Sequence, residues 1–408
     1  MSELSVKKST IIEVAVIRAL VVVFQLVFLK IYSNNTSADE LGVYYFLLTA
    51  SYSLNAFLLI PLDYYQQSQL YHLKAEEKSL RSFYPINQFV AKLTGSLLVL
   101  GNIICYFINP QYCYAITLIT MFAISTYGVT LFRGIINNLE HRRAAIYCLL
   151  IEYVLKIVFF LIIIQFHKPS SLVILGSLLS ASLVSFLVLF ILVIRLTEFK
   201  FESIKPIHLK DVFKFSYPIS ISAVINWIQT QSYSLILVPL GLPEVVGIYA
   251  TVANVGQGGM NAYSTIFAQI FVPNLYKSKG KYIGVYLRNA VLSIIFVLLV
   301  SALFSKTIIT LLTKPEFAMY AMVILFGIAC EAGNFLSGAL TIYLTLHNVT
   351  KATLTMSFVG LITFVVCFSL LYVFHFISVF TIGIPMVITQ IVIAAGLFII
   401  SRNKIAEN

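Results

Sequence analysis

Charged residues are scarce in this chain. Of its 408 residues, 11% are Asp, Glu, Lys or Arg, whereas a soluble domain carries about 25%. Hydrophobic residues make up 60% of the chain, and the mean hydropathy is +0.94. This composition excludes an ordinary soluble globular protein. It predicts an all-α polytopic membrane protein that has no sizeable soluble domain.

Acidic residues and catalytic motifs are also scarce. The three aspartates, Asp39, Asp63 and Asp211, all fall near predicted membrane surfaces. Gly280-Lys281 lacks the glycine that a phosphate loop needs five residues earlier, where Leu275 stands. The D-x-D, H-E-x-x-H and G-x-S-x-G patterns are absent. The sequence therefore predicts a protein that is not an enzyme and needs no cofactor.

The five cysteines have no C-x-x-C spacing, which disfavours a metal or redox site. They are Cys105, Cys113, Cys148, Cys330 and Cys367. The net charge of +11 comes with no nucleic-acid-binding module, so no nucleic-acid partner is expected. We interpret the basic excess as a signal of membrane topology.

Hydrophobic runs dominate what is present. A membrane-spanning helix needs about 20 apolar residues, and twelve runs meet this length. The predicted spans are 10–31, 40–62, 85–108, 112–134, 144–166, 170–194, 212–240, 245–272, 284–304, 317–343, 352–375 and 378–401. The first run is too long for a signal-peptide core and lacks a cleavage site, so we expect it to remain as a helix.

The distribution of Lys and Arg predicts the orientation. With the N-terminus in the cytoplasm, 20 basic residues fall on the cytoplasmic side and 4 on the outer side. Cytoplasmic loops carry the excess of basic residues. Both termini are therefore expected in the cytoplasm, and the protein in the inner (plasma) membrane.

The longest internal polar stretch, Leu196 to Lys210, falls midway along the chain. We predict an N-terminal six-helix bundle (1–195), a cytoplasmic linker (196–211) and a C-terminal six-helix bundle (212–408). Six spans is an even number, so both bundles enter the membrane in the same sense. They would be related by a pseudo-two-fold axis along the membrane normal.

A repeated helix start supports this division. Gly42-Val43-Tyr44 follows Glu40, and Gly247-Ile248-Tyr249 follows Glu244. Polar side chains then recur at helical spacing in both helices. The early set is Thr49, Tyr52 and Asn55, and the later set is Asn254, Gln257 and Asn261. These residues either line a polar cavity or make helix-packing contacts.

Charged residues inside the predicted spans are the strongest candidates for a site. Such residues are costly in lipid and usually face a partner or a watery cavity. Arg18, with Gln25 seven residues later, lies in the first span, and Lys92 lies in the third. Glu152 and Lys156 lie one turn apart in the fifth span, where they can pair with each other.

Glu331 stands near the middle of the tenth span with no basic residue in its own span. It is either protonated and hydrogen-bonded or a titrating site. We predict Glu331 and Glu152 as ion-coupling candidates. The seventh span adds Asn226 and Trp227, the chain's one tryptophan. Cations on one wall of a cavity, with amides and an aromatic ring on the other, would suit an anionic, sugar-bearing substrate.

These residues resemble a known family. The run FSYPISISAVINWIQTQSYSLIL, then G-L-P-E-V-V-G-I-Y, is similar to a region of the O-antigen flippases. These belong to the multidrug/oligosaccharidyl-lipid/polysaccharide exporter superfamily. D-E-L-G-V-Y after the first span, the length and the twelve spans also match. One departure is Ser232-Tyr233, where many members have an Asp-Arg pair.

The resemblance implies a flippase that moves an undecaprenyl-pyrophosphate-linked oligosaccharide, an O-antigen repeat unit, from the cytoplasmic to the periplasmic leaflet. It implies alternating access coupled to an ion gradient. Membrane lipid and other membrane proteins of polysaccharide assembly are the implied partners. Two alternatives stay open: a multidrug antiporter of the same superfamily, and an integral-membrane polysaccharide polymerase. A polymerase would have a long, Arg-rich outer loop, which is not seen here.

Overall fold

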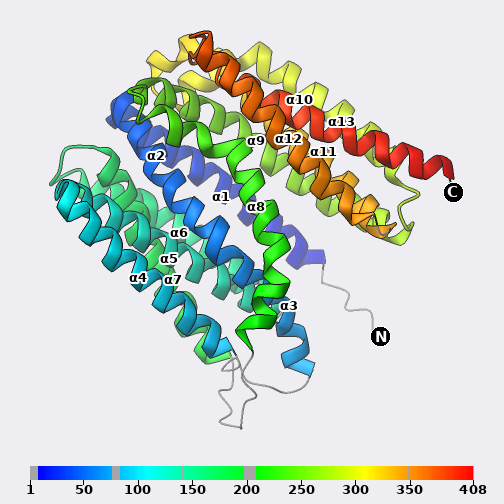
Figure 1. The fold of residues 1–408 in the computed structure, drawn as a ribbon, viewed down its shortest axis with the longest axis horizontal. Coiled ribbons are helices and arrows are strands. Elements are labelled where there is room, and N and C mark those ends of the chain that lie inside the picture. The colour runs from blue at the N-terminus through cyan, green and yellow to red at the C-terminus, as the bar shows by residue number, and fades with distance from the viewer. Residues whose placement is uncertain (1–7, 76–82, 140, 197–207, 348, 408) are drawn as a thin grey trace. The chain divides into compact units, whose positions relative to one another are not determined.

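Long helices form the whole of the described structure. The computed structural model describes residues 8–75, 83–139, 141–196, 208–347 and 349–407 (Figure 1). Within these ranges no strand occurs. The elements are α1 (Lys8–Asn35), α2 (Ala38–Leu54), η1 (Asn55–Leu59), α3 (Ile60–Ala75), α4 (Tyr84–Ile108), α5 (Gln111–Asn138), α6 (Arg142–Ile163), α7 (Ser171–Leu196), α8 (Leu209–Leu237), α9 (Pro243–Lys277), α10 (Ile283–Leu312), η3 (Pro315–Val323), α11 (Ile324–Leu346), α12 (Thr350–Val373) and α13 (Gly383–Glu407).

Twelve helical rods result, because α2, η1 and α3 run on as one helix, and so do η3 and α11. Among the described residues, ten helices are long and apolar enough to cross a membrane. The other two rods, α8 and α9, are long but carry more polar residues. The predicted class, an all-α polytopic membrane protein of twelve long helices, is confirmed.

Several predicted boundaries differ from those of the structure, and two of the differences have a clear local reason. The last helix begins at Gly383 and not at residue 378. Ser378 N donates to Thr381 Oγ1 at 2.8 Å, so a hydroxyl-bonded turn replaces the first helical turn. The second helix runs to Ala75 and not to residue 62. A π-helical turn, Asn55–Leu59, inserts into it without breaking it.

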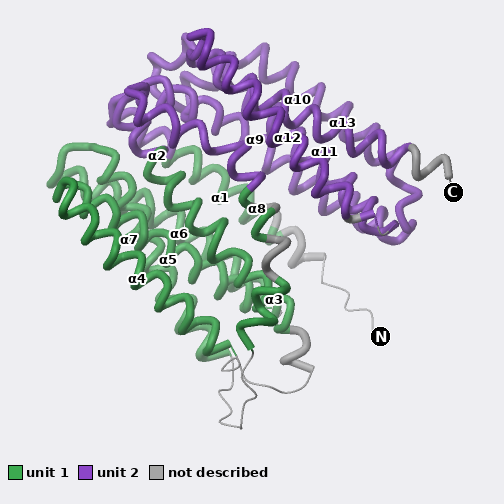
Figure 2. The backbone as a smooth tube through the Cα atoms, in the orientation of Figure 1, with its two compact units in different colours: residues 1–28, 46–224 green, residues 29–45, 225–408 purple. Residues whose placement is uncertain are grey.

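The chain divides into two compact units (Figure 2). Unit 1 comprises residues 1–28 and 46–224, and unit 2 comprises residues 29–45 and 225–408. The predicted linker, 196–211, lies largely outside the described residues, which stop at 196 and resume at 208. The end of α1 and the start of α2 belong to unit 2.

Close backbone packing explains why residues 29–45 join unit 2. A Cβ added to Gly42 would lie 1.9 Å from Pro243 O, and one added to Gly247 would lie 2.0 Å from Ala38 O. Any side chain at either position would clash with the facing backbone, so only glycine is accommodated there. The repeated G-V-Y and G-I-Y motifs thus pack the starts of α2 and α9 against each other.

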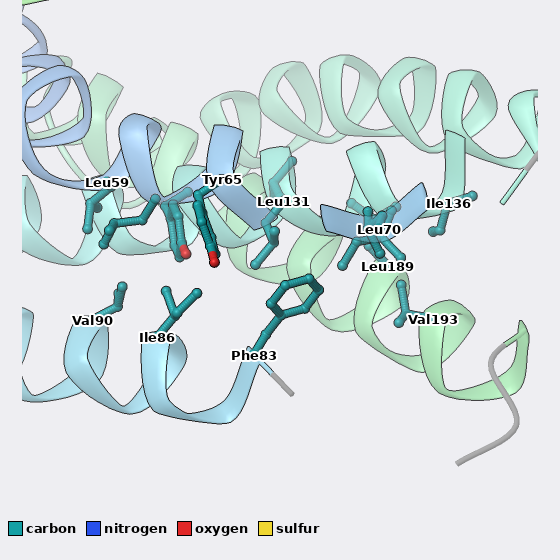
Figure 3. Packing of buried hydrophobic residues seen from close by; sticks show 14 of the residues in the cluster. Leu59, Tyr65, Leu70, Phe83, Ile86, Val90, Leu131, Ile136, Leu189 and Val193 are labelled. Atoms are coloured by element: carbon teal, nitrogen blue, oxygen red, sulfur yellow. The ribbon is translucent and has the colours of Figure 1, made fainter. Parts of the chain in front are cut away.

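The core of unit 1 is built from η1, α3, α4, α5, α6, α7 and α8. Ile86 and Val90 of α4 face Leu59 and Tyr65 of the second rod in Figure 3, and all four are buried. Leu131 of α5 completes this part of the cluster. Helices of a membrane protein gain little from hydrophobic transfer, so such clusters are held mainly by close packing.

Candidate functional site

Three charged side chains meet inside unit 1. Glu152 of α6 is 7% exposed and pairs with two cations. Lys156 Nζ lies 2.7 Å from Glu152 Oε1, one helical turn away. Arg133 of α5 donates from Nη2 to Glu152 Oε2. We call Arg133, Glu152 and Lys156 the charged trio. Two positive charges and one negative charge leave it with an excess of one positive charge.

Aromatic rings complete the surroundings of Lys156. Its Nζ lies 4.1 Å from the centroid of the Tyr153 ring, which supplies a cation–π contact. Tyr52 lies close enough to interact electrostatically with the Lys156 ammonium. The Tyr52 side chain is 43% exposed, and its ring packs 6.2 Å from that of Phe122. A buried cation thus adjoins a partly exposed tyrosine.

Helix α1 runs alongside α6 in this unit. Near its start, Glu13 Oε2 lies 2.7 Å from Arg143 Nη2. Near its end, the rings of Phe28 and Phe160 meet edge to face at 6.0 Å. Arg18 lies between these two contacts along α1.

Arg18 and Gln25 are exposed, and neither joins the charged trio through a described contact. Lys92 on α4 is exposed as well and stands apart from the trio. Asn55 is 4% exposed and starts the π-helical turn; its Nδ2 has no hydrogen-bond partner. The structure thus brings Tyr52, Glu152 and Lys156 together, and no described contact joins Arg18, Gln25, Lys92 or Asn55 to them.

In unit 2, glycines press α9 and α11 together. A Cβ at Gly256 would lie 2.2 Å from Ile324 O, and one at Gly327 would lie 1.9 Å from Ala253 O. This reciprocal contact explains why glycine occupies both positions. It also brings Gln257 and Glu331 within reach of each other.

Glu331 is accordingly held by amides. Its carboxyl group interacts with the side chains of Asn334, on its own helix, and Gln257, on α9. Among the described residues no Lys or Arg pairs with it. Glu331 therefore differs from Glu152, whose charge two cations compensate.

The other polar candidates of unit 2 fall into two groups. Asn254 interacts with Tyr45, whose hydroxyl lies 3.0 Å from that of Tyr32. Trp227 is partly buried, whereas Asn226 and Asn261 are exposed. The three amides of α9 therefore have different surroundings. Asn254 and Gln257 interact with side chains within the unit, and Asn261 is exposed.

Sequence reasoning missed two residues. Arg133 lies at the end of the predicted span 112–134, but α5 continues to Asn138 and Arg133 reaches Glu152 of the next helix. A basic residue near the end of one helix, followed by an acidic residue inside the next, was the available signal.

Asp63 is the second. It is 2% exposed, and both of its carboxylate oxygens accept from Gln67 Nε2, at 2.9 and 2.8 Å. It had been placed near a membrane surface because the second helix was expected to end one residue earlier. No described cation pairs with it.

A family model described as "Polysaccharide biosynthesis protein" matches residues 67–279. The match spans more than half of the 408 residues, and the chain belongs to this family. The predicted resemblance to polysaccharide exporters is thereby confirmed at the level of the family. Among curated proteins no sequence matches the chain.

Solved structures show the same fold. An inward-facing multidrug resistance transporter of the MATE family, MOP superfamily, matches with a TM-score of 0.68 at 15% identity, covering 96% of this chain and 98% of that one. An outward-facing transporter of the same family gives 0.65 at 14% identity, with 97% and 94% covered. The lipid II flippase MurJ, inward closed, gives 0.62 at 13% identity, with 96% and 87% covered. At these identities the likeness defines the fold alone.

Proposed function

We propose that this protein is a flippase for an undecaprenyl-pyrophosphate-linked oligosaccharide, such as an O-antigen repeat unit. It would carry this lipid from the cytoplasmic to the periplasmic leaflet of the inner membrane by alternating access. Membership of a polysaccharide biosynthesis family supports a polysaccharide precursor as the cargo. We also propose that both termini lie in the cytoplasm. Other membrane proteins of polysaccharide assembly would be partners.

The charged trio carries the proposal. An isolated buried cation is costly, and the Lys156 and Arg133 side chains are only 11% and 25% exposed. A single carboxylate neutralises one of the two positive charges. The excess positive charge is suited to a diphosphate, whose oxygens accept charge-assisted hydrogen bonds from both residue types. A site for cationic drugs would instead need an acidic excess.

Polar side chains elsewhere suit the sugars. Tyr52 in unit 1 has a partly exposed side chain, and Asn226 and Asn261 in unit 2 are exposed residues. Amides and hydroxyls can replace the hydrogen bonds that a sugar makes with water. Arg18 and Lys92 are two further exposed cations within predicted spans. We propose them as secondary contacts for the anionic head group.

Coupling to an ion gradient is assigned to Glu331 and not to Glu152. A carboxylate that is paired with two cations gains little from a proton. Glu331 interacts only with neutral amides among the described residues, so a proton would remove an uncompensated charge.

Complementation tests the proposal. A strain that lacks the gene should lose surface polysaccharide, and the wild-type gene should restore it. Lys156→Ala and Arg18→Ala are each expected to abolish this rescue at normal protein levels. Normal polysaccharide in either variant would remove that residue from the site.

The deletion phenotype separates the alternatives. Drug sensitivity with intact polysaccharide would indicate a multidrug antiporter. Surface lipid that carries single repeat units would indicate a polymerase.

A further inference from the structure

An open cavity of about 660 Å³ lies within unit 1, apart from the charged trio. It forms where the start of α5, the end of α6 and the start of α7 meet. Leu118, Ile163, Phe166 and Val173 line it. Sites for small molecules commonly enclose about 300–1,000 Å³, so this cavity is large enough to hold part of a ligand.

The wall of the cavity is mainly apolar and includes one histidine. His167 contributes to the lining, and the exposed Lys168 follows it. No Asp or Glu lines the cavity. Among the described residues no carboxylate pairs with Lys168. A mainly apolar hollow whose lining is followed in the sequence by a lysine matches an amphiphile that has an anionic head and a hydrocarbon tail.

Gly176 keeps the cavity open. A Cβ added at this position would meet no atom within 4 Å, so no neighbouring helix requires a glycine there. Glycine inside a helix costs about 1 kcal/mol relative to alanine. The residue thus weakens α7 without serving close packing, and the empty space that it leaves belongs to the cavity.

We infer that this cavity is a second lipid site, which binds the polyprenyl chain of a phosphate-bearing lipid with the phosphate beside His167 and Lys168. The inference rests on the proposed function, which supplies such a lipid. In the proposed topology, these helix ends reach the outer leaflet, so the site would receive the carried lipid after translocation.

The head group decides the selectivity for this lipid over bulk phospholipid. A tail that leaves the bilayer for an apolar cavity gains little from hydrophobic transfer, because lipid is already apolar. A basic residue near the membrane surface contributes about 1 kcal/mol toward an anionic lipid, or about fivefold in affinity. The diphosphate of the carried lipid and the phosphate monoester of undecaprenyl phosphate each carry more negative charge than a phosphodiester, so both gain more from an adjacent lysine.

The test is photocrosslinking to the purified full-length protein in nanodiscs. The probe is undecaprenyl phosphate with a diazirine on its chain, and a diazirine-bearing phosphatidylcholine serves as the comparison. Mass spectrometry then locates the labelled peptides. We expect undecaprenyl phosphate to label residues 114–118 and 163–180. Lys168→Gln should lower this labelling about fivefold.

Gly176→Leu fills the cavity and should lower the labelling at least as much. Gly95→Leu is the matched control, because a Cβ at Gly95 in α4 also meets no atom within 4 Å but lies outside the cavity. It should label like the wild type. Thermal unfolding of each variant checks that it is folded.

Equal labelling by phosphatidylcholine, without competition from unlabelled undecaprenyl phosphate, would overturn the inference, and so would absent labelling. Labelling is measured without transport, so this experiment can refute the lipid site without refuting the proposed flippase function. A protein that binds this probe but moves no lipid-linked oligosaccharide would retain the lipid site and lose the proposed function.

Discussion

Replacing Lys156 by glutamine separates the charge of the trio from its role in folding. Glutamine keeps much of the side-chain volume and removes one positive charge. Glu152 remains compensated by Arg133, so the trio becomes neutral and no buried charge is left unpaired. The loss of one hydrogen bond to a charged group then lowers stability by about 1.5–3 kcal/mol.

Glu152→Gln should destabilise the protein more than Lys156→Gln does. It leaves Arg133 and Lys156 as two uncompensated cations, and removing one partner of a buried pair costs about 3–5 kcal/mol. The unfolding temperature in detergent should therefore fall further for Glu152→Gln than for Lys156→Gln. A reversed order would show that the trio does not have the described charge balance.

Lys156→Gln should also weaken transport, even when the variant protein is folded. A charge-assisted hydrogen bond to phosphate contributes about 1.5–3 kcal/mol, so its loss weakens head-group binding about tenfold to hundredfold. The assay is translocation of a lipid-linked oligosaccharide in proteoliposomes at subsaturating substrate.

Arg143→Gln is the matched control for this assay. It also removes a cation from an ion pair of unit 1, but the Arg143 side chain is 57% exposed, and such pairs contribute about 0–1 kcal/mol. It should transport normally. If Lys156→Gln is folded and transports as well as Arg143→Gln, the trio does not hold the head group.

Three further predictions test other parts of the structure. Gly327→Val should lower the unfolding temperature strongly, because its Cβ would lie 1.9 Å from Ala253 O. In contrast, the Cβ of Gly258→Ala in α9 would meet no atom within 4 Å. This variant should have an unchanged free energy of unfolding, or one that is higher by up to about 1 kcal/mol. Asp63→Asn should unfold at the same temperature as the wild type or higher, since it removes an uncompensated buried carboxyl group; a lower unfolding temperature would show that the charge is stabilising. Glu331→Gln should abolish the dependence of transport on an ion gradient, which is measured by collapsing the gradient with an ionophore; unchanged dependence would remove Glu331 from coupling.

The helical architecture was predictable because it depends on hydrophobic length. Runs of about 20 apolar residues define spans whatever their neighbours are, and the twelve predicted runs match twelve helical rods. The helix ends were less predictable, because they depend on local hydrogen bonds. The hydrogen bond to the Thr381 hydroxyl forms a turn before the last helix, which therefore begins later than predicted. The π-helical turn that starts at Asn55 joins α2 to α3, so the second helix extends further than predicted.

The candidate site was only partly predictable. Glu152 and Lys156 lie one turn apart on a single helix, so their pairing followed from helical geometry. Arg133 comes from another helix. The register between two helices depends on how their side chains pack, and it cannot be read from the spacing of residues along the sequence. The glycine motifs show the same limit. Their repetition was visible in the sequence, but the mutual contact of Gly42 and Gly247 with the facing backbones required coordinates.

The central claim is that this protein moves a lipid-linked oligosaccharide by its anionic head group. The most direct measurement is translocation in proteoliposomes by the wild-type protein, comparing an undecaprenyl-diphosphate-linked oligosaccharide with the same oligosaccharide on an uncharged polyprenyl lipid. We predict that only the diphosphate-linked lipid reaches the opposite leaflet. Equal movement of both lipids, or of neither, would contradict the account.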